Sequence, residues 1–192
     1  MSTFERPIAL TDRVVLKPWD LSMADEMVRV VRENAAHLRT WLNWPESDYG
    51  ILHAERFIQQ QLDQVGTTDG ISVGLWEGSL LLGAVTMNHV DLQNRSTYLG
   101  YWLSATVRGR GFMTMAVRVV VDTLLGDRGY RRVVIAMDPR NVKSRAIPER
   151  LGFTQEGILR DVYRHRDCYI DWVIYAMLAP DWIRQRTQSK EC

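Results

Sequence analysis

The sequence predicts a mixed α/β domain, and three observations lead to this expectation. Short segments alternate between the two faces with a period of two, which is typical of strands. Two stretches, at residues 23–31 and 112–125, place apolar residues three and four positions apart, which indicates helices with one buried face. Strand-like and helix-like segments follow one another along the chain, an order that favours a sheet flanked by helices.

The first part of the chain is expected to form one strand and two helices. Residues 14–16 are apolar and predict a short first strand. Asp20 or Ser22 is placed to cap a helix through residues 23–31. A second helix is expected near residues 51–64.

A hairpin and a further strand follow. Residues 71–76 and 80–90 flank the turn residues Glu77–Ser79, which predicts an antiparallel pair. Residues 96–103 alternate in character and predict the next strand. The middle of the chain therefore reads as a meander.

The last part alternates helices with strands. A helix over 112–125 is expected to end at Gly126, and the apolar run 133–137 predicts a strand covered on both faces. A short helix over 144–151 is expected to stop at Gly152. Two final strands are expected, at residues 153–158 and 169–178.

Size and charge favour one globular domain. The chain has 192 residues and a mass of 22.2 kDa, so we expect residues 1–192 to form a single domain. With 24 basic and 23 acidic residues the net charge is +1, which gives no reason to expect direct nucleic-acid binding. No repeat or linker segment interrupts the chain.

Cysteine content and apolar runs argue against several other classes. Cys168 and Cys192 do not form a disulfide framework or a metal motif, and the four histidines are scattered, so no metal is expected. Residues 1–7 lack the pattern of a signal peptide. No apolar run approaches the ~20 residues that a membrane helix needs. We therefore expect a soluble cytoplasmic protein with no membrane partner.

The segment 108–113 carries the first chemical signal. Two glycines stand between a predicted strand and a predicted helix, where backbone amides at the start of the helix can face phosphate oxygens. By itself this pattern is more often that of a tight loop than of a phosphate cradle. The residues of the candidate phosphate-binding loop are Arg108, Gly109, Arg110, Gly111, Phe112 and Met113.

A second segment, residues 141–153, gives this loop its context. Together the two segments resemble the GNAT (GCN5-related) N-acetyltransferase superfamily. The family's pyrophosphate pattern, Q/R-x-x-G-x-G/A, falls on Arg108, Gly111 and Met113, although Met113 departs from the small residue expected there. The family's helix signature, N-x-x-S followed by L-G-F, falls on Asn141, Ser144, Leu151, Gly152 and Phe153.

Three further segments, 38–45, 98–103 and 153–157, resemble the branch that acetylates the N-termini of ribosomal proteins, the RimJ/RimL-like branch. The matches extend from Val14 to Leu178. The resemblance implies a sheet of about seven strands splayed in the middle, acetyl-CoA as co-substrate, an amine acceptor and a homodimer. It also implies direct transfer to the amine without a covalent acyl-enzyme.

The resemblance assigns further roles near the splay. Acetyl-CoA would lie along Trp102, Leu103 and Ser104, and a bulge would free the backbone N–H near Leu103 to polarise the thioester carbonyl. Ser144 is the candidate general acid for the leaving thiolate; the alternative is an ordinary helix serine. Asn141 would contact the cofactor, or else cap its own helix. Pro148 should distort the helix beside Ser144, because it has no N–H to donate to the Ser144 carbonyl.

The general base is not evident from the sequence. The ribosomal-type glutamate is expected at the position of Tyr163, which is therefore the candidate catalytic position on this strand. Asp161 would share its face if the strand were regular. An α-amine has a reference pKa of about 8, roughly 2.5 units below lysine, so it needs a weaker base. Other candidates for the base are Asp91, His89 and Glu156.

The acceptor is expected to meet a tryptophan-rich wall with Glu46 nearby; the alternative is a core or dimer contact. The proposed acceptor-binding residues are His37, Trp41, Trp44 and Tyr101. A basic cluster over residues 160–166 could face ribosomal RNA, although a solvated hairpin explains it better.

Three functions are compatible with these features. The first is acetylation of the N-terminal α-amine of a ribosomal or similar protein. The second is acetylation of a small amine such as an antibiotic or polyamine. The third, of another class, is a non-catalytic acyl-CoA-binding module, which would keep the loop at 108–113 but turn over no amine.

Overall fold

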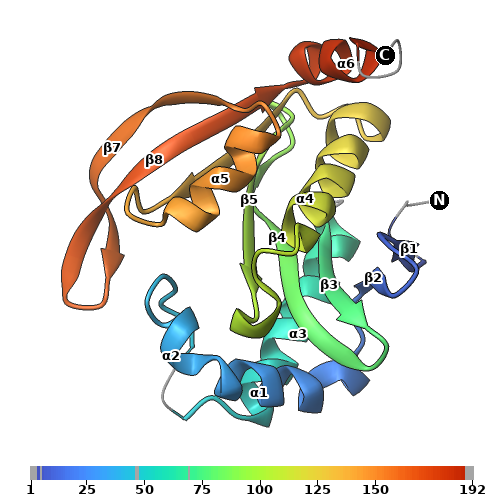
Figure 1. Cartoon of the computed structure of the whole chain (residues 1–192), viewed down its shortest axis with the longest axis vertical. Coiled ribbons are helices and arrows are strands. Elements are labelled where there is room, and N and C mark those ends of the chain that lie inside the picture. Colours follow the sequence, from blue (N-terminus) through green and yellow to red (C-terminus); the bar gives the residue numbers. More distant parts are fainter. Residues whose placement is uncertain (1–3, 5, 46–47, 69, 189–192) are drawn as a thin grey trace. The chain divides into compact units, whose positions relative to one another are not determined.

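The computed structural model describes residues 4, 6–45, 48–68 and 70–188, and for residues 65–68 it describes the backbone alone. The chain divides into two compact units. Unit 1 comprises residues 1–86 and 101–116, and unit 2 comprises residues 87–100 and 117–192. Figure 1 labels the helices and strands of both units.

The strands are hydrogen-bonded in the order β1-β2-β3-β4-β5-β6-β8-β7, which confirms a mixed sheet flanked by helices. In the described part of the chain the sheet has eight strands, where about seven were expected. The additional strand is β1 (Ile8–Ala9), which pairs with β2 (Val14–Pro18) through Ile8 and Leu16. A two-residue strand is too short to show an alternation in the sequence.

Unit 1 contains the predicted hairpin. β3 (Ser72–Glu77) and β4 (Leu80–Asp91) pair antiparallel around a turn with Gly78 at φ 61°. β5 occupies Ser96–Leu103, with the bounds predicted from its alternation. Its last three residues and the first seven residues of β4 lie in unit 1.

The helices of unit 1 precede the hairpin in the chain. A 3₁₀ turn at Leu21–Met23 is capped by Asp20, which accepts from the Ser22 N–H, and it leads directly into α1 (Ala24–Glu33). Two more helices follow, α2 (Ala35–Leu38) and α3 (Ile51–Thr68). Apolar residues of these helices form one core cluster with Trp76, Leu81 and Trp102 from the strands.

Unit 2 is built on β6 (Arg132–Met137) and β8 (Cys168–Leu178), which pair antiparallel. The first three residues of β5 pair parallel with β6, from Ser96 to Tyr98, and among the described residues this pairing stops although both strands continue within the unit. This is the parting of neighbouring parallel strands that the resemblance implies.

β7 (Thr154–His165) runs twice as far as the six-residue strand expected there. It pairs with β8 at the edge of the sheet, and its register shifts between Gln155 and Gly157 and between Leu159 and Tyr163. These irregularities break the period of two, which is why the sequence did not reveal the full length. The basic cluster at 160–166 lies at the far end of this hairpin, largely exposed to solvent, as the solvated alternative predicted.

The predicted end of the long helix is wrong. α4 (Phe112–Asp122) does not stop at Gly126 but passes into a π-helical turn at Thr123–Asp127. The Arg128 N–H donates to the Thr123 carbonyl at 2.9 Å, a wider turn than the α-helix makes. The positive φ that ends the turn belongs to Gly129, at 63°.

Two more helices complete unit 2. α5 (Val142–Arg150) is followed by Gly152 at φ 74°, as expected for a helix stop. α6 (Ala179–Gln188) was not anticipated from the sequence. Its buried Trp182 donates to Asp122 at the end of α4, at 2.7 Å.

Candidate active site

The loop before α4 has the backbone conformation that a phosphate cradle requires. Gly109 and Gly111 have φ values of 79° and 80°, a region that residues with a side chain adopt only at a cost. A Cβ placed on either glycine would meet no other atom within 4 Å, so the space beside both is open. α4 begins at Phe112, where first-turn N–H groups lack partners inside the helix. A pyrophosphate fits this arrangement.

Charge and anchoring distinguish the residues of the loop. Arg108 and Arg110 are exposed cations beside the positive end of the α4 dipole. The Arg108 Nε donates to the Ala105 carbonyl at 3.1 Å, and another guanidinium nitrogen lies 3.4 Å from Nδ1 of His37. Met113 is buried, so only its backbone is positioned to meet a ligand.

The end of β5 is fixed tightly to β4. The Ser104 N–H donates to the Leu82 carbonyl at 2.7 Å, and Ser104 itself is buried. Gly83 stands opposite: a Cβ there would lie 2.2 Å from the Trp102 carbonyl oxygen and 3.0 Å from the Leu103 Cα. Glycine at position 83 therefore permits the close approach of the two strands where acetyl-CoA was expected to bind.

Part of the tryptophan-rich segment packs against the core of unit 1, as the core alternative for this segment expects. Trp44 is 36% exposed, yet its ring contacts the buried Trp102 edge-on with centroids 6.0 Å apart. Trp41 and Tyr101 are half-buried, as is His37 on α2. Glu46, which was placed near this wall, lies outside the described residues.

In unit 2, α5 begins with the predicted cap. The Asn141 Oδ1 accepts from the Ser144 N–H at 3.2 Å, so the capping alternative for Asn141 is confirmed. Ser144 is half-buried in the first turn of the helix, four residues before Pro148. The missing proline N–H removes the helical donor to the Ser144 carbonyl.

A side-chain bridge spans the same turn of α5. The buried Tyr175 on β8 accepts from Arg145 Nε at 3.1 Å and donates to Glu149 Oε1 at 2.7 Å. Burial raises the pKa of the Tyr175 phenol, and the bond to Glu149 raises it further, so the hydroxyl stays protonated as a donor. Tyr175 thereby supports the helix at the point where Pro148 interrupts its backbone bonding.

Tyr163 is half-buried and stacks on Trp172 with ring centroids 4.8 Å apart. The expectation that Asp161 shares its face depended on a regular strand. It is wrong in that premise, because Asp161 has φ 48° within the irregular stretch between Leu159 and Tyr163. The Asp161 N–H instead donates to Asp171 at 3.0 Å.

The other candidate bases have local roles. Glu156 forms an ion pair with Arg132, which holds the pKa of that carboxyl below its ordinary value. Asp91 accepts from Asn94 at the turn before β5, which lowers its pKa. His89 is exposed, with its ring edge-on to Tyr98.

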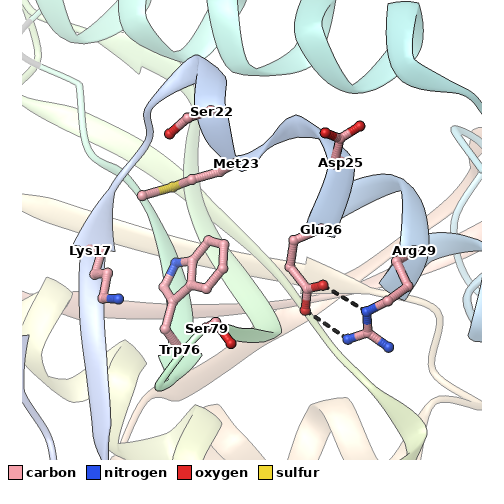
Figure 2. A pocket seen from close by; sticks show the side chains of 8 residues that line it. All are labelled: Lys17, Ser22, Met23, Asp25, Glu26, Arg29, Trp76 and Ser79. Carbon is pink, nitrogen blue, oxygen red and sulfur yellow. Dashed lines mark hydrogen bonds and ion pairs between the residues drawn. The ribbon is translucent and has the colours of Figure 1, made fainter.

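A hollow of about 520 Å³ opens elsewhere on unit 1, between α1 and the β3–β4 turn (Figure 2). It contains none of the residues predicted for the site. Its polar side chains already pair locally: Glu26 binds Arg29, and Lys17 donates to the Gly78 carbonyl at 3.2 Å. We therefore assign the hollow no part in the chemistry. Its lining residues are Lys17, Ser22, Met23, Asp25, Glu26, Arg29, Trp76 and Ser79.

Within the described ranges, no group of three or more histidine, cysteine, aspartate or glutamate side chains is arranged to hold a metal ion. None of the helices formed by the described residues is both long enough and apolar enough to cross a membrane.

A glycine-containing loop before a helix, on a mixed sheet whose parallel strands part, is the arrangement that the resemblance to the acyl-CoA-dependent GNAT transferases implied. The chain belongs to this family: residues 13–154 match the sequence model of the acetyltransferase (GNAT) domain. It is accordingly an N-acetyltransferase that uses acetyl-CoA.

Relatives in sequence carry ribosomal names. YdaF of Bacillus subtilis (strain 168), described as a candidate ribosomal N-acetyltransferase, is 30% identical over 169 residues, which cover 88% of this chain and 91% of YdaF. The ribosomal-protein-serine acetyltransferase of Escherichia coli (strain K12) is 24% identical over 162 residues, covering 79% of this chain and 85% of that protein.

Solved structures agree in fold. The microcin C7 self-immunity acetyltransferase MccE, in complex with acetyl-CoA and AMP, is 28% identical with a TM-score of 0.85, covering 92% of this chain and 98% of that one. RimL, the ribosomal L7/L12 α-N-protein acetyltransferase in complex with coenzyme A, has a TM-score of 0.85 at 23% identity, covering 92% and 99% of the two chains.

Two residues near the site escaped the sequence reasoning. Asn34 is buried and bonds to the segment that follows β5, and Gly83 permits the approach of β4 to β5. An isolated glycine within a strand pattern was the available signal for Gly83. The bonds of Asn34 join positions about seventy residues apart, and no local pattern in the sequence reports them.

Proposed function

We propose that the protein acetylates the N-terminal α-amine of a ribosomal or similar protein. The observation that carries this proposal is the match to YdaF along 88% of the chain, which includes the tryptophan-rich segment as well as the cofactor loop. An α-amine also suits a site without an evident carboxylate base, because a usable fraction of it is already neutral near pH 7.

The mechanism we propose is direct attack of the amine on the thioester, without an acyl-enzyme. The loop 108–113 binds the pyrophosphate, and the backbone N–H of Leu103 stabilises the oxyanion. Ser144 protonates the departing thiolate, directly or through water. Tyr163 occupies the position of the expected glutamate and contacts the acceptor. Within this proposal the chain acts in the cytoplasm as a single acetyltransferase domain and forms a homodimer.

A small amine is the second candidate acceptor. The observation that favours it is the likeness to MccE, whose structure holds acetyl-CoA and AMP and whose name describes a self-immunity enzyme. In that case His37, Trp41, Trp44 and Tyr101 would contact a small aromatic or cationic molecule rather than a peptide.

The test measures thiol release from acetyl-CoA with peptides that begin with serine or alanine and with a panel of small amines. We expect turnover on the peptides and none when their N-terminus is blocked, even if they contain lysine. Ser144→Ala should lower kcat about a hundredfold on the preferred acceptor. Turnover confined to small amines would overturn the proposed acceptor, and an unchanged kcat for Ser144→Ala would remove the proposed acid.

A further inference from the structure

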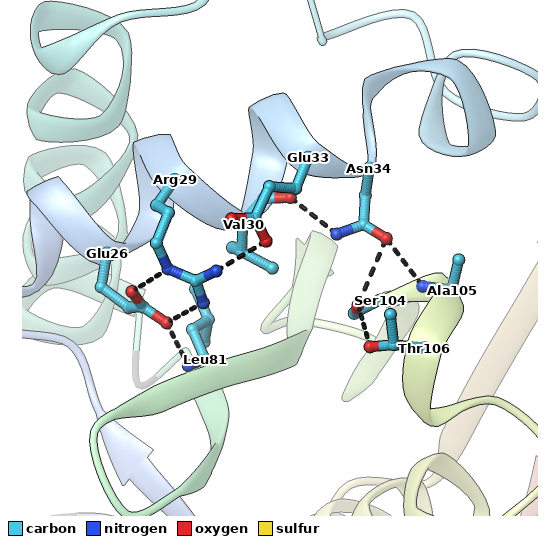
Figure 3. A network of polar contacts seen from close by, with 9 residues as sticks. All are labelled: Glu26, Arg29, Val30, Glu33, Asn34, Leu81, Ser104, Ala105 and Thr106. Atoms are coloured by element: carbon cyan, nitrogen blue, oxygen red, sulfur yellow. Dashed lines mark hydrogen bonds and ion pairs between the residues drawn. The ribbon is translucent and has the colours of Figure 1, made fainter.

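Asn34 links the end of α1 to the segment that leads into the cofactor loop (Figure 3). Its Oδ1 accepts from the Ala105 N–H at 2.8 Å and from the Ser104 hydroxyl at 3.2 Å. Its Nδ2 donates to the Val30 carbonyl at 2.8 Å. A backbone N–H only donates and a carbonyl only accepts, so these partners fix the orientation of the amide. Asn34 is 6% exposed, and Ser104 is 4% exposed.

The bond to Ala105 acts as a cap supplied by a distant element. A 3₁₀ turn spans Ala105–Val107, and Ser104 at its N-cap position makes no side-chain cap bond. The first N–H of the turn is satisfied by Asn34 instead, in the way a local serine or asparagine would satisfy it. The Ser104 hydroxyl also lies 3.0 Å from the hydroxyl of Thr106, within the same network.

The held turn is the anchor of the cofactor loop. The Ala105 carbonyl accepts from Nε of Arg108, the first residue of the loop, at 3.1 Å. The position of Asn34 is therefore passed to Arg108 through one short turn. The Nδ2 of Asn34 also donates to the carbonyl of Val30, a residue of the unit 1 core. Asn34 therefore fixes the position of the turn relative to that core.

We infer that Asn34 is a positioning residue for acetyl-CoA: it sets the turn 105–107 and through it the loop 108–113. This inference rests on the proposed role of that loop. It assigns Asn34 no contact with the substrate, and its expected signature is a change in acetyl-CoA binding rather than in the acceptor or in the chemical step.

The same helix offers a matched control. Glu26 ties the other end of α1 to the sheet by accepting from the Leu81 N–H at 2.8 Å, and it also binds Arg29 (Figure 3). Glu26→Ala thus removes a tie of similar kind between α1 and the strands without touching the turn 105–107. It is expected to lower the melting temperature and to leave acetyl-CoA binding within about twofold of the wild type.

The primary variant is Asn34→Ala in the full chain. We expect the Kd for coenzyme A, measured by calorimetry, and the KM for acetyl-CoA to rise about tenfold, with the KM for the acceptor and kcat within about threefold. Binding equal to that of Glu26→Ala, or a loss confined to kcat, would overturn the inference.

A second variant removes the other half of the bond. Ala105→Pro deletes the N–H that donates to Asn34 Oδ1. The substitution suits the backbone, because Ser104 has a ψ of 140°, as a residue before proline prefers, and proline is favoured at the first position of a helical turn. It should weaken coenzyme A binding by a factor similar to that of Asn34→Ala. The double variant should bind coenzyme A as well as the weaker-binding of the two single variants does, because both substitutions remove the same hydrogen bond. If Asn34→Ala fails to fold, Ala105→Pro decides, and wild-type binding by it would overturn the inference.

Gly111→Val separates this inference from the proposed function. A loss of coenzyme A binding in Gly111→Val, with normal binding in Asn34→Ala, would refute only the role of Asn34. Normal binding in Gly111→Val would refute the cofactor loop itself, and the inference with it.

Discussion

The hydroxyl of Tyr49 is buried beside the tryptophan wall and has no hydrogen-bond partner in the part of the chain that the structure describes. Its ring contacts the rings of Trp44 and His53, with centroid distances of 5.8 and 5.5 Å. Burial raises the pKa of this phenol far above its ordinary value, so the group is neutral at any working pH. An unsatisfied buried hydroxyl costs stability, on the order of 1–3 kcal/mol.

We therefore expect Tyr49→Phe to leave the free energy of unfolding unchanged or to raise it by about 1 kcal/mol, because the ring contacts remain. Urea denaturation measures the difference. Tyr49→Ala is the control and should lose roughly 3–5 kcal/mol through the cavity it creates. A clear loss of stability in Tyr49→Phe would show that the hydroxyl has a partner, such as an ordered water.

Asp138 stabilises the loop between β6 and α5 through its charge. Its carboxylate accepts from the backbone N–H of Arg140 at 2.8 Å and from its guanidinium, while its side chain is 8% exposed. The guanidinium of Arg140 holds the pKa of Asp138 below its ordinary value. A depressed pKa adds stability above the unfolded-state pKa of about 4, and this stability is lost as the pH falls through the folded-state pKa.

Asp138→Asn should accordingly lower the free energy of unfolding by about 1 kcal/mol at pH 7, because Arg140 is largely exposed and its pairing is screened. The gap to the wild type should close as the pH is lowered below 4, which a series of denaturant titrations would follow. Asp181→Asn, at an exposed pair with Arg184, should change little at any pH. A gap that is independent of pH would contradict the electrostatic role.

Among the elements, the pairing of β4 with the end of β5 depends on one missing side chain. Gly83→Ala would force a Cβ against backbone atoms of Trp102 and Leu103, and neither strand can yield without moving the other. We expect a loss of about 1–3 kcal/mol in stability and of about tenfold or more in kcat/KM, since the displaced segment is the proposed acetyl-CoA edge.

Gly126→Ala is the matched comparison for this variant. A Cβ at position 126 would meet no atom within 4 Å, and Gly126 does not have a positive φ. Stability should remain equal or increase slightly. Equal melting temperatures and equal kcat/KM for the two alanine variants would disprove the close-approach argument.

The regular elements could be predicted because their patterns are local. β5 was predicted with its observed bounds because alternation and flanking turns are unbroken there. β7 was predicted at half its length because two register shifts erase the alternation, and the end of α4 was misplaced because a π-turn accommodates Gly126 without a positive φ. Such irregularities are set by hydrogen bonds to other elements, and these cannot be read from a local window.

At the scale of the whole molecule, binding of acetyl-CoA should be visible as stabilisation. A ligand at a hundred times its Kd adds about 2.7 kcal/mol, which for a chain of this size corresponds to a rise in Tm of roughly 5–10 °C. Differential scanning fluorimetry with and without coenzyme A measures the shift. Gly111→Val should melt somewhat below the apo wild type, because valine is strained at φ 80°, and it should show little shift with coenzyme A, because the loop must leave its native conformation. A full shift in this variant would place the cofactor elsewhere.

The family could be predicted from the sequence because it is recognised by short motifs, such as the one that falls on Arg108 and Gly111. The supporting residues could not. Asn34 and Tyr175 act on segments far away in the chain, and each uses a residue type that is common in ordinary structural roles. The identity of the acceptor is harder still to predict from the sequence, because it depends on the combined shape of side chains from several elements.

The helix α6 has a consequence for how the protein withstands proteolysis. Asp122 accepts from both Trp182 and Arg186 at 2.7 Å, and Gln185 packs against Gly152 at the end of α5. The helix α6 therefore contacts both α4, which starts at the proposed cofactor loop, and α5, which carries Ser144. Cleavage between Leu178 and Trp182 would therefore destabilise unit 2, because loss of α6 would remove the buried Trp182 side chain and leave a cavity. The fraction of molecules that keep α6 during limited proteolysis thus measures how much of a preparation has unit 2 fully folded.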